Sequence, residues 1–368
     1  MAVIAIGPGM AASGLAAEVA DGSAWERVWS HATLYANEDN RFIQKFALSG
    51  RLQSDSAWFD ADQGEINDDF LWRRFRFGFK SNLLRDWALH IEADFDLNES
   101  SGDSYTRLTD AYIGWSAGKD LSIKALKQSV GFTLDGATSS KNLLTMQRND
   151  LTNNLWFTGE YFTGFGAKGK VDENWSYNAG IFSSDGNDEL SRFDASYFSL
   201  LSMGYHFTDT VKLTDSLIRI DYVYNDEDVN AATRDFSQVV SLVTKWATGP
   251  WGLWTDLSAG KGYAGQSDVG GVVLMPFYDF SPRIQAVLRY TWLSSAGDNG
   301  LRLPRYAGMI VDGRGNEYNE IYAGVNVYFN GHKFKWQTGL EYGSMKDDAD
   351  DIGSYQGWGL NTGLRLYW

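Results

Sequence analysis

The chain has 368 residues, with 47 acidic and 32 basic side chains and a formal net charge of −15 at pH 7. This charge disfavours a nucleic-acid function, because no basic stripe is present that could release phosphate counterions. Hydrophobic residues make up 43% of the chain and the mean hydropathy is −0.33, values typical of a water-soluble protein or of a transmembrane β-barrel, in which only the lipid face is apolar. The 15 Trp, 39 Gly and only 5 Pro favour the barrel, since Trp gathers at membrane interfaces and Pro interrupts sheets.

The N-terminal region contains an uncharged, mostly apolar run from Val3 to Ala17, which is too short to span a bilayer. Gly14, Leu15 and Ala16 have the spacing of a signal-peptide cleavage site, but the basic region that precedes such a run is absent. We expect residues 1–17 to be a signal-peptide remnant, with a disordered tail as the alternative. Residues 18–41 are expected to form a periplasmic segment and residues 42–368 the transmembrane barrel.

The rest of the chain alternates apolar and polar residues in segments of about 8 to 12 residues, the pattern of half-buried strands. In one of them Trp87, Leu89, Ile91, Ala93 and Phe95 alternate with His90, Glu92, Asp94 and Asp96. Sixteen such segments predict an all-β, antiparallel transmembrane barrel with an even number of strands. They lie near residues 46–54, 74–80, 87–96, 106–116, 121–128, 163–171, 175–182, 196–207, 216–224, 235–246, 252–260, 268–278, 283–293, 319–329, 333–342 and 358–368.

The connections between these segments are short and long in turn. Short links such as 117–120 and 172–174 separate longer polar segments such as 60–68, 129–153 and 294–318. Barrels of the bacterial outer membrane have this asymmetry, because periplasmic turns only reverse the chain whereas extracellular loops are free to grow. We therefore expect the bacterial outer membrane as location, with its lipid and lipopolysaccharide as surroundings.

The C-terminal segment alternates as a closing strand must, because an open sheet edge in lipid would leave backbone groups unsatisfied. Its final residues, with Gly363, Leu366 and the terminal Trp368, resemble the signal by which the barrel-assembly machinery recognises its substrates. These three residues are the predicted assembly signal, and that machinery is a predicted partner.

Enzyme chemistry has little support in the sequence. The four His residues show no metal-ligand spacing, and no nucleophile motif is present, so we expect no enzyme activity, no metal site and no cofactor. The acidic runs Asp226–Asp228 and Asp347–Asp351 lie in predicted extracellular loops, where they are either solvated or hold divalent cations.

Several stretches resemble the phosphate-selective porins O and P, and the resemblance covers nearly the whole chain after the N-terminal region. It is carried by Ser49–Gln53, Trp72–Gly78, Asp110–Gly114, Thr138–Lys141, Leu288–Trp292 and Tyr322–Tyr328. It implies a sixteen-stranded, homotrimeric porin that passes small polar solutes and prefers anions such as phosphate. The sequence departs from the family at the entry to the 129–153 loop, and no ladder of basic residues leading inward is evident.

Basic residues are the predicted pore lining. Alternation directs Arg51, Arg74, Arg76, Lys80, Lys124 and Arg289 toward the lumen, and the resemblance adds Arg73 beside Arg74 and Lys127 near a constriction. Loop 129–153 contributes Lys141 and Arg148. Acidic lumen residues are also numerous, so a mutually neutralised wall is the alternative. An alternative function is a structural or interaction barrel whose long acidic loops bind partners or divalent cations.

Overall fold

The computed structural model describes residues 24–99, 102–118, 120–157, 159–208 and 213–368. The predicted signal-peptide remnant, residues 1–17, lies outside the described residues. Among the described residues, no helix is long and apolar enough to cross a membrane.

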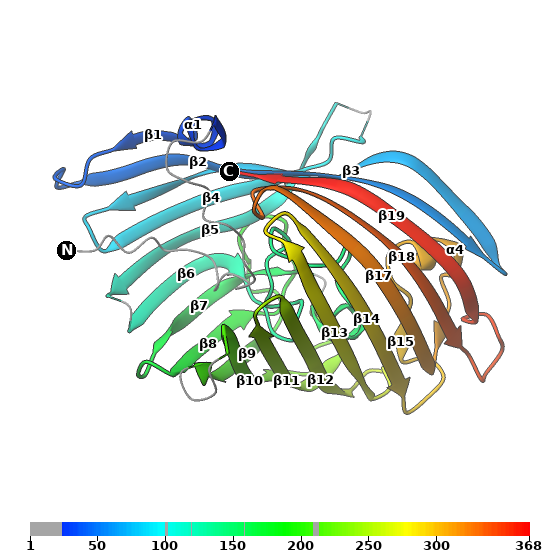
Figure 1. The fold of residues 1–368 in the computed structure, drawn as a ribbon. Coiled ribbons are helices and arrows are strands. Elements are labelled where there is room, and N and C mark those ends of the chain that lie inside the picture. The colour runs from blue at the N-terminus through cyan, green and yellow to red at the C-terminus, as the bar shows by residue number, and fades with distance from the viewer. Residues whose placement is uncertain (1–23, 100–101, 119, 158, 209–212) are drawn as a thin grey trace.

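Sixteen strands of the described chain form one closed antiparallel barrel (Figure 1). Consecutive strands pair throughout, and closure comes from the pairing of the last strand with the first, which joins Gly357–Tyr367 to Arg51–Ala61. The predicted fold class is therefore confirmed. The strands are β2 (Ile43–Ala61), β3 (Gly64–Leu83), β4 (Trp87–Phe95), β5 (Tyr105–Ala117), β6 (Leu121–Ser129), β7 (Tyr161–Lys170), β8 (Trp175–Ser183), β9 (Tyr197–Tyr205), β10 (Asp215–Asn225), β11 (Phe236–Thr248), β12 (Trp251–Gly262), β13 (Val269–Ser281), β14 (Ile284–Ser295), β17 (Glu317–Asn330), β18 (Phe334–Lys346) and β19 (Tyr355–Tyr367).

Short elements complete the described chain. Helix α1 (Ala24–Ser30) and strand β1 (Thr33–Ala36) precede the barrel, and β1 pairs with the start of β2. The Trp29 indole N–H donates to the Tyr367 carbonyl at 2.7 Å, which ties this segment to the end of β19. Helix α2 (Asp150–Leu155) lies between β6 and β7, while β15 (Leu301–Arg302), α4 (Ala307–Ile310) and β16 (Arg314–Gly315) lie between β14 and β17.

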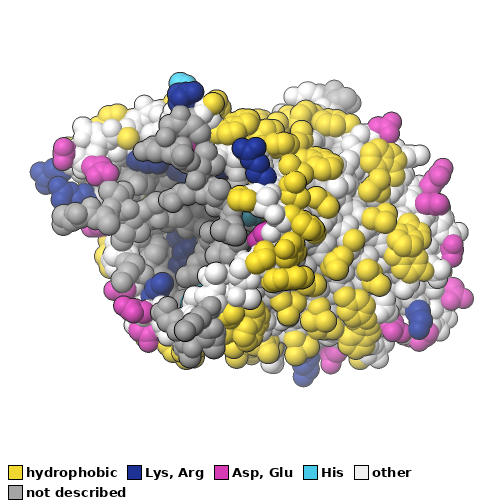
Figure 2. Space-filling model, in the orientation of Figure 1, with side chains coloured by type: hydrophobic (Ala, Val, Ile, Leu, Met, Phe, Trp, Pro, Cys, Tyr) yellow, Lys and Arg dark blue, Asp and Glu magenta, His cyan; other side chains and the backbone are white. Residues whose placement is uncertain are grey.

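The alternation of each strand places apolar side chains outside and polar ones inside. On β14, Leu288 is 56% exposed whereas its neighbour Arg289 is 3% exposed. Figure 2 shows apolar side chains spread over the outer surface of the strands, with acidic side chains mainly at the two ends. A surface that is apolar around the middle and charged at its ends suits a bilayer.

The loops differ in length between the two ends, as predicted, although not everywhere: the link between β9 and β10 lies at the end of the short turns and is nine residues long. The segment 60–68, predicted as a long loop, is a two-residue turn between β2 and β3, because both strands continue to Ala61 and Gly64. Ile66 faces inward there and packs against a cluster formed by Ala57, Phe59 and Tyr306. This inward packing extends the hairpin where the polar sequence suggested a loop.

Candidate functional site

The loop between β6 and β7, residues 130–160 and called L3 below, folds into the lumen (Figure 1). Its backbone is bonded to carboxylates of the barrel wall: Thr133 N–H donates to Asp221 at 3.0 Å and Leu134 N–H to Asp256 at 2.7 Å. These bonds exist because an inward loop must satisfy its polar backbone groups away from bulk water. L3 therefore narrows the barrel from within.

Two buried ion pairs fasten the middle of L3 to the opposite wall. Arg289 on β14 binds Glu320 on β17 through two nitrogens at 2.7 and 3.0 Å, and donates to Thr145 of L3 at 3.0 Å. Arg365 on β19 contacts Asp55 at 2.6 Å and donates to the Met146 carbonyl at 3.4 Å. Such paired, hydrogen-bonded guanidinium groups fix geometry as well as charge.

Apolar packing secures the two ends of L3. Phe132 and Phe157 of the loop lie edge to face, and Phe157 makes the same contact with Phe198 on β9. Leu151 and Leu155 of α2 belong to the same buried cluster. L3 is thus a packed part of the lumen wall.

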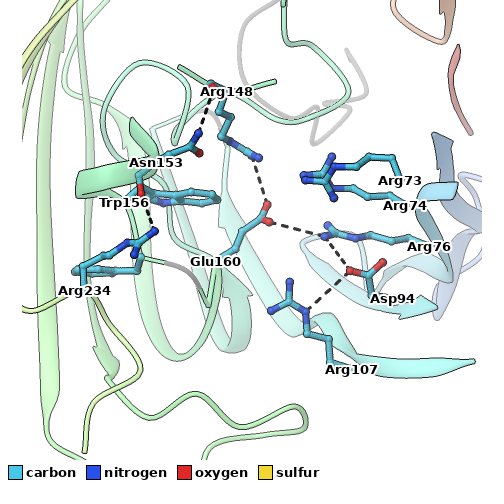
Figure 3. A pocket seen from close by; sticks show the side chains of 11 residues that line it. Arg73, Arg74, Arg76, Asp94, Arg107, Arg148, Asn153, Trp156, Glu160 and Arg234 are labelled. Carbon is cyan, nitrogen blue, oxygen red and sulfur yellow. Dashed lines mark hydrogen bonds and ion pairs between the residues drawn. The ribbon is translucent and has the colours of Figure 1, made fainter. Parts of the chain in front are cut away.

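Arginine side chains surround a cavity of about 260 Å³ between L3 and the wall (Figure 3). They come from four places in the chain: β3, β5, L3, and the loop between β10 and β11. Six arginines oppose two carboxylates, which leaves an excess of four positive charges among the lining residues, all of which the structure describes. The cavity is lined by Arg73, Arg74, Arg76, Asp94, Arg107, Arg148, Asn153, Trp156, Phe157, Glu160 and Arg234.

A β-bulge in β3 directs two consecutive arginines into this cavity. Gln53 pairs with Arg74 and Ser54 with Trp72, so Arg73 is the extra residue of β3. Strict alternation would turn Arg73 toward lipid, but a bulge re-aims the side chain of its extra residue. Figure 3 shows Arg73 and Arg74 extending side by side from β3.

A second bulge, in β5, reverses the alternation of that strand. Glu92 pairs with Asp110 and Ala93 with Leu108, which leaves Thr109 as the extra residue. The Thr109 hydroxyl donates to the Glu92 carbonyl at 2.9 Å, and Arg107 comes to pair with Asp94 on the lumen side. Sequence reasoning missed Arg107 because an unbroken period of two directs it outward.

Arg234 was also missed, because it lies in a loop where no periodicity indicates direction. It donates to the Asn153 carbonyl of L3 at 2.9 Å. Two further loop arginines, Arg302 and Arg314, both donate to the Gln266 side chain, at 3.4 and 3.0 Å. Burial and the positive charges of these two lower the pKa of Arg234 to about 10. The sequence suggested no inward series of basic residues, whereas the fold places Arg302 and Arg314 within electrostatic reach of Arg234.

The cavity's ion pairs are looser than those that fasten L3. Glu160 lies 3.8 Å from Arg76 and 3.6 Å from Arg148, and Asp94 lies 4.0 Å from Arg107. The closest pair, Arg76 with Asp94, measures 3.2 Å. Arg74 donates to Gln53 at 2.9 Å, and among the described residues no carboxylate lies within ion-pair distance of it. The guanidinium groups therefore keep N–H donors available to a solute.

The remaining predicted pore residues have other surroundings. Arg51 pairs with Glu92 at 3.2 Å and donates to Ser140 of L3 at 2.7 Å. The Lys127 ammonium donates to three carbonyls, those of Asn187, Asp188 and Glu189, at 2.7 to 2.8 Å, so it holds the loop between β8 and β9.

Three lysines complete the predicted pore set. Lys80 is half-buried on the inner face of β3, and Lys124 lies 3.9 Å from the Tyr112 ring centroid. Lys141 of L3 is 7% exposed and lies 4.9 Å from the Tyr367 ring centroid. Of the ten predicted pore residues, the cavity thus brings together Arg73, Arg74, Arg76 and Arg148.

The predicted assembly-signal residues lie on and directly after β19. Gly363 faces β2, since an added Cβ would lie 2.0 Å from the Ser54 carbonyl oxygen. Leu366 pairs with Leu52, and Trp368 exchanges backbone bonds with Gly50 at 3.2 and 3.3 Å. Within the described residues, no group of three His, Asp or Glu side chains could hold a metal ion.

The profile of the phosphate-selective porin O and P family matches residues 46–213. The fold resembles the anion-selective porin from Comamonas acidovorans (TM-score 0.59, 10% identity, 88% of this chain and 99% of that one). It also resembles OmpF of Salmonella typhi (TM-score 0.64, 14% identity, 91% and 100%) and the trimer form of Vibrio cholerae OmpT (TM-score 0.56, 12% identity, 88% and 99%). No curated protein sequence matches significantly. By its matched residues the chain resembles the phosphate-selective porin O and P family over part of its length, and it forms an outer-membrane channel for small solutes.

Proposed function

We propose that this channel prefers anions and that the arginine cavity beside L3 selects them. The observation that carries the proposal is the excess of guanidinium groups there, six against two carboxylates. Charged side chains crowded at a constriction set the selectivity of a pore. Guanidinium groups match the planar or tetrahedral oxygens of carboxylates and phosphates, so oxyanions of the size of phosphate are the proposed solutes.

Arg73 and Arg74 are the proposed primary contacts. Within the described part of the chain, Arg74 has a single hydrogen bond, to the neutral Gln53, and the buried Nε of Arg73 has no hydrogen-bond partner. A buried donor without a partner is costly, and an anion that enters the cavity would remove that cost. Arg76 has fewer free N–H groups, because it contacts Asp94, Glu160 and the Tyr161 hydroxyl.

The loop arginines support a route into the cavity. Arg314 and Arg302 lie in the loop between β14 and β17, and Arg234 follows at the cavity itself. Burial lowers the pKa of Arg302, and Arg314 lowers it further, which reflects the closeness of these two cations. A row of like charges attracts counter-ions and raises their local concentration at the entrance.

A homotrimer is the proposed assembly. The support comes from a structural neighbour, the Vibrio cholerae protein described in its trimer form, over which 88% of this chain aligns. Blue-native electrophoresis with mass determination of the detergent-solubilised protein distinguishes a trimer from a monomer. A monomeric mass at all detergent concentrations would contradict the proposed assembly.

The anion preference is tested by comparing Arg74→Gln with the wild-type channel in a planar bilayer under a KCl gradient. We expect the chloride-to-potassium permeability ratio to fall roughly twofold or more, since the variant removes from the cavity one positive charge that no carboxylate neutralises. Gln keeps a polar side chain in the lumen, and no carboxylate loses its only partner.

Lys127→Gln is the matched control, because it also removes one positive charge from the lumen side of the barrel. Lys127 binds loop carbonyls and is absent from the cavity lining, so its variant should retain the wild-type permeability ratio. An unchanged ratio in Arg74→Gln, or an equal fall in both variants, would contradict the assignment of selectivity to the cavity.

A further inference from the structure

The Glu160 carboxylate lies among the same guanidinium groups that an incoming anion would contact. Glu160 is the last residue of L3, is 9% exposed, and points from the loop toward Arg76 and Arg148 (Figure 3). Its two oxygens lie 3.8 Å from Arg76 and 3.6 Å from Arg148. It is therefore an anion supplied by the protein itself within the arginine cavity.

The distances show that Glu160 neutralises these arginines without occupying their donors. Neither contact reaches hydrogen-bond length, which for charged N–H···O pairs is about 2.7 to 2.9 Å. The pair of Arg219 with Asp221 on the barrel wall is tight by comparison, with hydrogen bonds of 2.8 and 2.9 Å. The two nitrogens that face Glu160 each use one N–H elsewhere: Arg76 Nη2 donates to Asp94 at 3.2 Å and Arg148 Nη2 to the Thr138 carbonyl at 3.5 Å. The second N–H of each nitrogen remains for a solute anion, which can bind there while Glu160 stays nearby.

The backbone around Glu160 holds the carboxylate in this place. Glu160 has a φ of 59°, a conformation that residues other than glycine rarely adopt. Its carbonyl accepts the Val130 N–H at 3.0 Å, and the preceding Gly159 carbonyl accepts Arg107 at 3.0 Å. The two ends of L3 and a cavity arginine thus fix one strained residue at the cavity edge.

Glu160 also stays charged under all ordinary conditions. Burial raises its pKa, but the positive charges of Arg148, Arg76 and Arg74 outweigh that effect and bring the pKa to about 2. At neutral pH its negative charge is therefore permanent, and it opposes every anion that enters.

We propose that Glu160 is an internal counter-ion that shortens the stay of each anion, so that the arginine cavity passes anions instead of trapping them. The proposal rests on the anion preference proposed above. Conduction requires a site that attracts an ion strongly enough for the ion to enter and binds it weakly enough for the ion to leave. An entering anion shares the guanidinium charge with Glu160, and when it leaves, Glu160 again compensates that charge.

The test measures block of chloride current by inorganic phosphate in wild-type and Glu160→Gln channels reconstituted in planar bilayers. Loss of the internal charge should lower the half-blocking phosphate concentration by about tenfold, because a unit charge at this distance strongly affects binding. Glu160→Asp, which retains the charge but withdraws it by one methylene, should give an intermediate value. It also serves as the test if Glu160→Gln fails to show the heat-modifiable mobility of a folded barrel.

Glu227→Gln is the control, since Glu227 is exposed on the loop between β10 and β11 and lies outside the cavity lining. Its half-blocking concentration should equal that of the wild type. A Glu160→Gln channel with wild-type phosphate block overturns the role of Glu160 while leaving the anion preference intact. The anion preference has a separate readout, the zero-current potential of the wild-type channel.

Discussion

At the scale of single residues, the arginines that fasten L3 hold their carboxylates more closely than Arg107 and Arg148 of the cavity do. Arg289 holds Glu320 through two bonds of 2.7 and 3.0 Å. In the cavity, by contrast, Arg148 approaches its carboxylate only to 3.6 Å. The same side chain thus serves structure or selectivity according to whether a carboxylate engages its N–H groups.

Lys141 gives a prediction of pH dependence at this scale. Burial, together with the positive charges of Arg51 and Lys80, lowers its pKa from 10.5 to about 7 against the opposing charges of Glu92 and Asp110. Between about pH 7 and 10.5 the unfolded chain therefore binds the proton that the folded chain has lost. Unfolding free energy should rise with pH across that window, by up to about 1.4 kcal/mol per pH unit.

Lys141→Met should remove this contribution, so the difference in thermal midpoint between variant and wild type should change as pH rises from 6 to 9. Thermal unfolding in detergent, followed by loss of heat-modifiable mobility, measures it. A difference between variant and wild type that is the same at every pH would show that Lys141 keeps its ordinary pKa.

At the scale of elements, the two bulges show where sequence reasoning holds and where it stops. Alternation predicts Arg74 and Arg76 on the inner face of β3, and both line the cavity, because that part of the strand is regular. Arg107 was missed because the extra residue Thr109 reverses the inward face of β5. A bulge depends on how two strands pair, and this pairing is not visible in the period of one strand.

Loops are the other limit of prediction from sequence. The 129–153 segment was recognised as a loop able to narrow a pore, but its wall contacts, such as Leu134 with Asp256, join residues far apart in the chain. Arg234 has no periodic neighbours, and its place in the cavity follows from the bond to Asn153. The barrel follows from local patterns, whereas the site depends on long-range contacts.

The anchor of L3 gives a prediction at the scale of elements. Arg289→Met should leave Glu320 buried without its partner and destabilise the protein by about 3 to 5 kcal/mol, the usual cost of breaking a buried pair. Freed from its Thr145 contact, L3 should also move, which would appear as added noise in single-channel current.

The double variant Arg289→Met/Glu320→Gln is the control, because it removes both charges together. Its stability should recover most of the loss, while the current noise should remain, since the bond from Arg289 to Thr145 is still absent. Chemical denaturation in detergent and bilayer recording measure the two effects. Equal stability of the single and double variants would contradict the uncompensated-charge explanation.

At the scale of the whole molecule, net charge and local charge have opposite signs. The chain carries −15 overall, yet the lining of the cavity carries an excess of four positive charges. Acidic side chains lie mainly at the ends of the barrel in the view of Figure 2. Because fields are focused inside a low-dielectric barrel, an acidic protein can still select anions.

The zero-current potential of the wild-type channel in a planar bilayer separating unequal KCl concentrations tests this account most directly. If the arginine cavity is the filter, anions cross more easily than cations, and we expect the zero-current potential to have the sign of the chloride equilibrium potential. A potential of the sign set by potassium would show that the acidic groups of the barrel determine selectivity, and would contradict the assignment of the cavity as the filter.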